Sequence, residues 1–165
     1  MIGTLFIIFL GTALHFTFAS SGNNPIVGAF SAVNESVWEH LKLPFWPSIL
    51  WLLITMYPLR KTVSNFFSAK ATGIIFMLLI IPLVFYSYTA FTEEILIVDI
   101  ATFMIAVIIG QLASYELYKQ ANGSKLTEII AIVVMTLLAI IFITFTFYPP
   151  HLMIFMDSNT FQYGI

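Results

Sequence analysis

The amino-acid sequence predicts an all-α protein, a polytopic bundle of about five transmembrane helices. Three observations predict this fold. Sixty per cent of the 165 residues are apolar and only 8% are charged, and the mean hydropathy of +1.00 is too high for a water-soluble domain. The apolar residues form runs that approach the roughly 20 helical residues needed to cross a bilayer. We therefore expect residues 1–165 to form a single membrane domain.

The expected spans, in chain order, are residues 1–20, 34/44–58, 72–92, 95–118 and 126–148. The first run lacks a basic start and a convincing cleavage site, so it is interpreted as a span and not as a signal peptide. The second is short unless a helix that bends at Pro44 and Pro47 extends it back to Asn34. Turn residues followed by an apolar stretch suggest that the first outer loop, 21–43, is a re-entrant or amphipathic lid.

The basic residues indicate the orientation of the bundle. Five of the six fall in or beside the two loops that follow the second and fourth spans, and only Lys42 lies elsewhere. Because basic residues concentrate in cytoplasmic loops, the amino terminus is expected inside the cell and the carboxyl terminus outside. The expected location is the plasma or inner membrane, crossed several times. The five residues are Arg60, Lys61, Lys70, Lys119 and Lys125.

Charge and cysteine content exclude several kinds of site. The net charge is only -2 and there is no basic run, so we expect no nucleic-acid partner. The sequence contains no cysteine, which excludes disulfides, thiolate metal sites and cysteine nucleophiles. Asn34-Glu35-Ser36 and Asn122-Gly123-Ser124 match the glycosylation sequon.

The titratable residues gather at the outer end of the expected bundle. All three histidines and six of the eight acids fall in its outer half. The positive-inside rule does not explain this asymmetry, because acids contribute little to that rule. These residues are His15, Glu35, Glu39, His40, Glu93, Glu94, Asp99, His151 and Asp157.

Two members of this group lie within expected spans. Charged groups at membrane depth are costly unless they are paired or neutralised, so His15 and Asp99 are expected to face the bundle interior. Each is either a site residue or a structural group that hydrogen-bonds a neighbouring helix. Their placement at the same end of the bundle favours a site.

The densest polar stretch is Asn34-Glu35-Ser36-Val37-Trp38-Glu39-His40-Leu41-Lys42. As a helix capped by Asn34, it would place Glu35, Glu39 and Lys42 on one face, with His40 on the neighbouring stripe. One interpretation is an amphipathic interfacial helix with an internal Glu39–Lys42 pair. The other is that its acids and imidazole face a site inside the bundle.

Imidazoles combined with carboxylates are typical ligands of zinc or a similar divalent ion. We predict the metal ligands to be His15, His40, His151 and Glu39. The predicted catalytic residues are Glu35, Glu39, His40 and Asp99. No His-Glu-x-x-His pair is present, so the ligands must converge from several segments. Without metal, Glu39 or Asp99 could orient a histidine general base, with Ser20, Ser21 or Ser36 as nucleophile.

The chain resembles a family of small prokaryotic five-helix membrane proteins of unknown function. The resemblance spans the whole chain and is most specific in the Asn-Glu-Ser-Val-Trp-Glu-His-Leu-Lys string at residues 34–42. Further matching segments are Ser21 to Gly28 and Tyr148-Pro149-Pro150-His151. The resemblance implies a membrane protein with five helices and no particular activity.

Three functions fit this sequence. The first is a membrane-embedded enzyme, with or without a divalent metal, that acts on a lipid or lipid-linked substrate at the outer leaflet as a hydrolase or transferase. The second is a small transporter or channel in which Asp99, His15 and Gln111 mark a polar path. The third is a binding or assembly subunit without catalytic activity. In each case the expected surroundings are membrane lipids, and we favour the enzyme.

Overall fold

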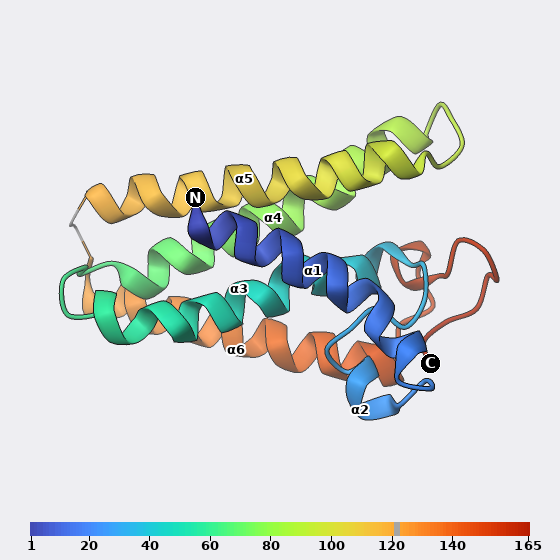
Figure 1. Ribbon diagram of the computed structural model, residues 1–165, viewed down its shortest axis with the longest axis horizontal. Coiled ribbons are helices and arrows are strands. Elements are labelled where there is room, and N and C mark those ends of the chain that lie inside the picture. The colour runs from blue at the N-terminus through green and yellow to red at the C-terminus, as the bar shows by residue number, and fades with distance from the viewer. Residues whose placement is uncertain (121–122) are drawn as a thin grey trace.

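The computed structural model describes residues 1–120 and 123–165 (Figure 1). Within these ranges the chain folds into an all-α bundle of six α-helices followed by one turn of 3₁₀-helix. In chain order they are α1 (Ile2–Ser20), α2 (Pro25–Gly28), α3 (Val37–Leu59), α4 (Phe66–Thr89), α5 (Leu96–Lys119), α6 (Lys125–Phe147) and the 3₁₀-helix η1 (Met153–Phe155).

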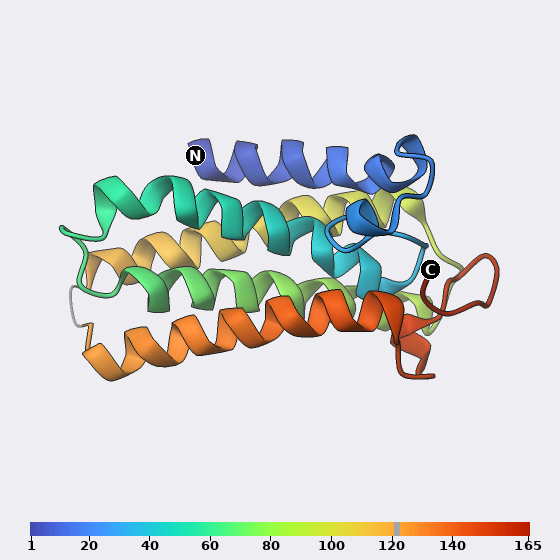
Figure 2. The same cartoon turned by 90° about the horizontal axis from the view of Figure 1, so that it is seen from below.

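The five long helices run side by side and alternate in direction (Figures 1 and 2). Helix α4 occupies the centre and packs against α3, α5 and α6, whereas α1 packs against α3 and α5. The short helix α2, the loop that leads into α3 and the carboxyl-terminal tail all lie at the right-hand end of Figure 1. We call this the loop-rich end. It is where the sequence predicts the histidines and acids to gather.

Four helices are long and apolar enough to cross a membrane: α1, α4, α5 and α6. Many of their large apolar side chains are exposed on the outside of the bundle, as expected for a protein whose solvent is lipid. These four helices indicate a multi-pass membrane protein. Helix α3 is as long as the others but less apolar, because it contains Glu39, Lys42 and three prolines.

Helix α3 begins later than the sequence analysis expected. Its amino-terminal cap is Ser36, whose side chain accepts a hydrogen bond of 3.3 Å from the Glu39 amide. Asn34 instead accepts a bond of 3.0 Å from the Ser36 amide and stays outside the helix. Glu35 therefore precedes the helix and does not share a face with Glu39. This difference separates the two carboxylates into two sites.

Two glycines bring α4 and α5 into close contact. A Cβ atom added at Gly73 would lie 2.5 Å from the carbonyl oxygen of Gly110, and one added at Gly110 would lie 2.5 Å from that of Gly73. Small residues at such a crossing allow two membrane helices to pack backbone against backbone. This contact sets the distance between α4 and α5 and therefore the position of α5 in the bundle.

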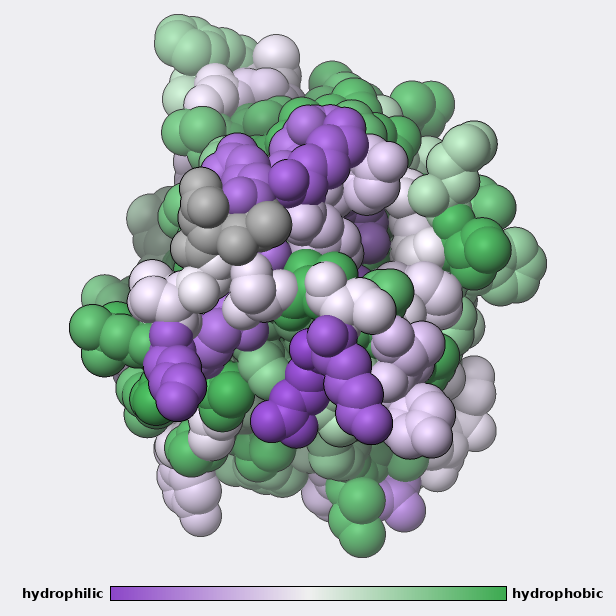
Figure 3. All heavy atoms as spheres, turned by 90° about the vertical axis from the view of Figure 1, so that its left-hand side faces the viewer, coloured by the Kyte–Doolittle hydropathy of each residue, from purple (hydrophilic) through white to green (hydrophobic). Residues whose placement is uncertain are grey.

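The opposite end of the bundle carries most of the basic side chains. The α3–α4 and α5–α6 connections meet there, at the left of Figure 1, and hydrophilic side chains gather on that face (Figure 3). We call it the basic end, because Arg60, Lys61, Lys119 and Lys125 belong to or adjoin these connections. The sequon asparagine Asn122 lies outside the described residues.

Candidate functional site

Three side chains converge at the loop-rich end from three separate segments. His15 comes from the last turns of α1, Glu35 from the loop before α3, and His40 from the first turn of α3. Oε2 of Glu35 lies 3.3 Å from Nε2 of His40 and 3.9 Å from Nε2 of His15. The two imidazoles meet edge to face, with ring centroids 5.1 Å apart. One potential ligand atom from each residue lies within 4.8 Å of the others.

The other nitrogen of His40 determines what its Nε2 can do. Nδ1 lies 2.9 Å from the carbonyl oxygen of Ser36, one turn earlier. A carbonyl oxygen only accepts, so we assign the proton of a neutral His40 ring to Nδ1. Nε2 then carries a lone pair that points toward a carboxylate oxygen. Two acceptors at 3.3 Å require a cation between them, either a proton or a metal ion.

The carboxyl-terminal tail holds the backbone of Glu35. The Glu35 amide donates to Oδ2 of Asp157 at 2.8 Å, and the Asn34 side chain donates to the carbonyl oxygen of Gly164 at 3.0 Å. Asp157 is itself buried and also accepts from the amides of Asn159 and Thr160. These contacts bridge more than a hundred residues of sequence, and they fix the position from which the Glu35 side chain extends.

Hydrogen bonding also sets the charge of the carboxylate. When Nε2 of His40 carries a proton, its hydrogen bond to the carboxylate lowers the pKa of Glu35 below its usual range and outweighs the opposite effect of partial burial. Glu35 is therefore ionised at neutral pH. An ionised carboxylate beside two imidazoles is the charge state that a divalent cation requires.

A cavity of about 70 Å³ adjoins the cluster. Glu35 and His40 line it at one side, and the rest of its wall is mostly apolar side chains from α3, α4 and α5. One water needs roughly 15 Å³ in the same measure, so the cavity has room for several waters or a small reacting group. Its apolar wall consists of Val37, Leu43, Ile81, Phe85 and Phe103.

Asp99 lines the same cavity from the first turn of α5. Its Oδ1 accepts a hydrogen bond of 2.7 Å from the Tyr88 hydroxyl at the end of α4. Its Oδ2 is buried and has no hydrogen-bond partner among the described residues. Such a group carries a large desolvation cost unless a proton, a water or a cation meets it. Asp99 therefore lines the cavity and carries one buried oxygen that no described group satisfies.

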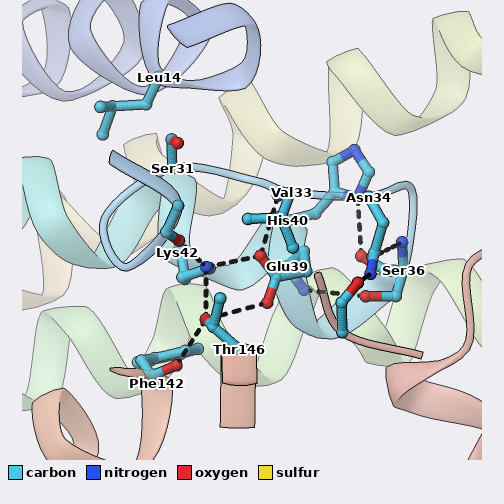
Figure 4. A network of polar contacts seen from close by, with 12 residues as sticks. Leu14, Ser31, Val33, Asn34, Ser36, Glu39, His40, Lys42, Phe142 and Thr146 are labelled. Atoms are coloured by element: carbon cyan, nitrogen blue, oxygen red, sulfur yellow. Dashed lines mark hydrogen bonds and ion pairs between the residues drawn. The ribbon is translucent and has the colours of Figure 1, made fainter. Parts of the chain in front are cut away.

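Glu39 is directed to a different place. Its carboxylate pairs with Lys42 at 2.6 Å, and both side chains are at least 97% buried (Figure 4). Lys42 also donates to Thr146 of α6 at 2.7 Å and to the carbonyl oxygen of Gly28 at 2.7 Å. Glu39 accepts from the Val33 amide at 3.0 Å. The intrahelical Glu39–Lys42 pair was one of two interpretations of the sequence, but the pair is buried in the bundle.

The structure thus brings together part of the predicted site. His15, Glu35 and His40 meet, and Asp99 shares a cavity with Glu35 and His40. The Glu39 carboxylate pairs with Lys42 and makes no hydrogen bond or ion pair with a histidine among the described residues. His151 is exposed and stacks on Tyr163 with ring centroids 4.7 Å apart, away from the cluster. The geometry favours Glu35 over Glu39 as the carboxylate beside the imidazoles.

One of the three pairs of ligand atoms in the cluster is already spaced as in a tetrahedral zinc site. Zinc binds nitrogen and oxygen ligands at about 2.0–2.1 Å, which places two tetrahedral ligands about 3.3 Å apart. The His40–Glu35 separation of 3.3 Å already matches this distance, and His15 needs to approach Glu35 by a few tenths of an ångström. The Ser36 carbonyl orients the ring of His40, as outer-sphere groups do for metal-bound histidines. A fourth position can open on the cavity.

Comparison with known proteins identifies the family but no activity. A model of a family of unknown function (DUF6512) matches residues 1–165. The chain belongs to this family. The comparison found no match among curated proteins and none among solved structures. The fold and the site of this DUF6512 member therefore have to be interpreted from their own chemistry.

Sequence spacing did not assign Tyr88 or Glu94 to the site. Tyr88 is the partner of Asp99, and the short α4–α5 connection was a usable signal, because residues on either side of such a turn face each other. Glu94, in the same connection, was expected at this end of the bundle but not in the site, and it also lines the cavity. Outside the site, the contact between Lys42 and Thr146 gave no signal, since it joins residues 104 positions apart.

Proposed function

We propose that the chain is a membrane-embedded, metal-dependent enzyme that acts on a lipid or lipid-linked substrate. The observation that carries the proposal is the convergence of His15, Glu35 and His40 beside a largely apolar cavity. Two histidines and one glutamate are also the protein ligands of a well-known group of catalytic zinc sites. Such sites leave one coordination position free for water or substrate.

The proposal includes the orientation of the bundle. We assign α3 as the fifth span, because its 23 residues extend about 34 Å at the helical rise per residue. The five basic residues that follow α3 and α5 or adjoin those connections then lie in the cytoplasm. The amino terminus is cytoplasmic, and the metal site and carboxyl-terminal tail face the opposite side of a plasma or inner membrane.

The cavity supports an amphiphilic substrate. Its wall is mainly apolar, and its polar groups Glu35, His40, Glu94 and Asp99 come from the segments nearest the end of the bundle. A substrate with a polar reacting group and a lipid chain would place the polar group in the cavity and leave the chain in the surrounding bilayer. Such a substrate can enter from the bilayer without crossing water.

The residues of the site would have separate roles in a hydrolysis or group transfer. His15, Glu35 and His40 would hold the cation, which when bound makes water a better nucleophile and polarises a carbonyl or phosphoryl oxygen. Asp99, with one unpartnered oxygen on the cavity, is placed to accept a proton from the attacking water or hydroxyl. The Tyr88 hydroxyl fixes the orientation of the Asp99 carboxylate.

Activity tests the proposal most directly. Purified protein in detergent would be incubated with a total membrane lipid extract, with and without a chelator, and the lipids compared by mass spectrometry. We expect a lipid product that disappears on chelation, returns with added zinc, and is absent in His40→Gln and Asp99→Asn. His151→Gln is the matched control and should keep full activity. If chelation and both substitutions leave the product unchanged, the proposal is wrong.

One observation bears on a transporter. A second cavity lies toward the basic end, but Ile7, Met77 and Val107, all 0% exposed, form an apolar cluster in the bundle. A polar path through the bundle would have to pass this apolar cluster, so the cluster gives no support to a transporter with a fixed polar path. Flux across proteoliposomes that requires Asp99 would favour transport. A protein that stays bound through purification, with no lipid product, would favour the binding subunit.

A further inference from the structure

The second cavity is the larger of the two described here, at about 900 Å³. It lies between α1, α3, α4 and α5, in the half of the bundle nearest the basic end. Volumes of 300–1,000 Å³ are typical of sites for small organic ligands. The rim residues Ile2, Leu5, Leu112 and Tyr115 are all exposed, so the cavity opens toward the surface that contacts lipid.

A buried cation without an anion lies in this cavity. Lys70, in the second turn of α4, is only 5% exposed and lines the wall. Its ammonium lies 5.8 Å from the ring centroids of Trp51 and Tyr118. Apart from these two ring contacts, it makes no ion pair or hydrogen bond among the described residues. Two aromatic faces reduce the cost of burying a charge but do not neutralise it.

The two acids toward the basic end, Glu116 and Glu128, have other partners. Glu128 accepts hydrogen bonds of 2.8 Å from the amides of Phe67 and Ser68, where it caps α4. Glu116 pairs with Lys119 at 2.7 Å on the surface. The protein therefore supplies Lys70 with no counter-ion in the part of the chain that the structure describes.

Two hydroxyl groups in the wall of the same cavity have few partners. Ser114 is 2% exposed, and beyond each other its Oγ and the hydroxyl of its neighbour Tyr118 have no hydrogen-bond partner among the described residues. Both residues line the cavity, and so does Gln111. An ammonium and two hydroxyl-bearing side chains in the wall of one cavity are groups that can bind an oxyanion.

We propose that this cavity binds the anionic phosphate headgroup of a membrane lipid. Lys70 pairs with the phosphate, and Ser114 and Tyr118 donate hydrogen bonds to its oxygens. The acyl chains leave across the exposed apolar rim of α1 and α5. This site is separate from the cavity beside the His15–Glu35–His40 cluster, because the two cavities share no lining residue.

The lipid is favoured over free phosphate by the shape of the site. The rim is apolar and exposed, and free phosphate has nothing to place on it. The bilayer around this site is itself made of lipid. A lipid headgroup is therefore available there at a higher effective concentration than free phosphate. The expected ligand is a phospholipid with net negative charge.

Lipid titration of the purified protein tests this inference. Dioleoyl phosphatidylglycerol would be added to protein in dodecyl maltoside, with binding followed by native mass spectrometry and thermal unfolding. Dioleoylglycerol and sodium phosphate form the two comparison arms. We expect phosphatidylglycerol to bind and raise the melting temperature, and neither comparison compound to do so. Equal stabilisation by dioleoylglycerol, or by phosphate alone, would overturn the assignment.

Substitutions separate this site from general surface attraction. Lys70→Met should weaken phosphatidylglycerol binding at least tenfold, and Ser114→Ala several-fold. Lys70→Met should also melt at a higher temperature than the unsubstituted protein in the absence of lipid, because a buried unpaired charge is removed. Lys61→Met, an exposed lysine at the same end, is the matched control and should bind normally. If Lys61→Met loses as much binding as Lys70→Met, the proposal is overturned.

Discussion

The backbone amide of Glu35 donates a hydrogen bond of 2.8 Å to the carboxylate of Asp157, 122 residues away. The contact joins the loop before α3 to a tail that follows the last span. Loops are usually the most mobile parts of a fold, yet this one supplies a carboxylate between two histidines. The tail is thus part of the site, because it limits where the Glu35 side chain can lie.

Asp157→Asn should therefore loosen the site without touching a ligand. An asparagine retains one acceptor oxygen but loses the charge that strengthens three backbone hydrogen bonds. We expect a loss of about 1.5–3 kcal/mol in stability and a several-fold loss in zinc affinity. Thermal unfolding and zinc titration measure the two effects. Asn159→Ala, an exposed change in the same turn, should alter neither.

Stability should depend on the ionisation of Asp157. Burial favours its neutral form, but the amides of Glu35, Thr160 and Asn159 more than offset this and lower its pKa below the ordinary 3.8. Because the folded pKa is the lower one, this contribution is complete well above pH 3.8 and is lost as the pH falls through the folded pKa. The melting temperature of Asp157→Asn should fall less between pH 5 and pH 3 than that of the unsubstituted protein. Identical slopes would contradict this account.

The buried Glu39–Lys42 pair should behave as a single unit. Lys42→Met leaves a buried carboxylate without its partner, and we expect a loss of about 3–5 kcal/mol. Glu39→Gln should cost a similar amount. The double substitution should cost much less than the two single losses together, because no unpaired charge remains. The surface pair Lys119→Met and Glu116→Gln is the comparison, with each change expected to cost less than about 1 kcal/mol. Additive losses at Glu39 and Lys42 would show that the pair is not coupled.

Replacing either glycine at the contact between α4 and α5 with alanine should lower the stability of the protein. A Cβ at Gly73 would lie 2.5 Å from the Gly110 carbonyl oxygen, so the backbones must separate. Gly73→Ala is expected to lose about 1–3 kcal/mol of stability, and Gly110→Ala a similar amount. Ala101→Val, which enlarges an exposed position on α5, should change stability little. Unchanged melting of both glycine variants would show that the helices do not meet here.

Composition and periodicity were enough to predict an all-α bundle with long apolar helices. They also placed His15, Glu35, His40 and Asp99 at one end, because alternating helices bring their ends together. Sequence spacing did not predict the positions of side chains that depend on tertiary contacts. It paired Glu35 with Glu39 on one helical face, but the Ser36 cap moves Glu35 off the helix and toward His40.

His151 shows a second kind of failure. Its position just after the last span predicted a place at the same end of the bundle, but not the direction of its side chain. The tail turns back so that His151 stacks on Tyr163. That turn depends on contacts of Asp157 and Asn34 with distant backbone groups, which no local pattern encodes.

The zinc content of purified ligand variants is the most direct test of whether His15, Glu35 and His40 bind a metal ion. Protein stripped with a chelator would be reloaded with zinc, passed through a desalting column and analysed for metal and protein content. We expect about one zinc per chain in the unsubstituted protein and in His151→Gln, and almost none in His15→Gln, Glu35→Gln or His40→Gln. Each variant should retain helical circular dichroism, which excludes unfolding as the cause. An unsubstituted protein that holds no zinc, or three ligand variants that hold as much as His151→Gln, would contradict this expectation.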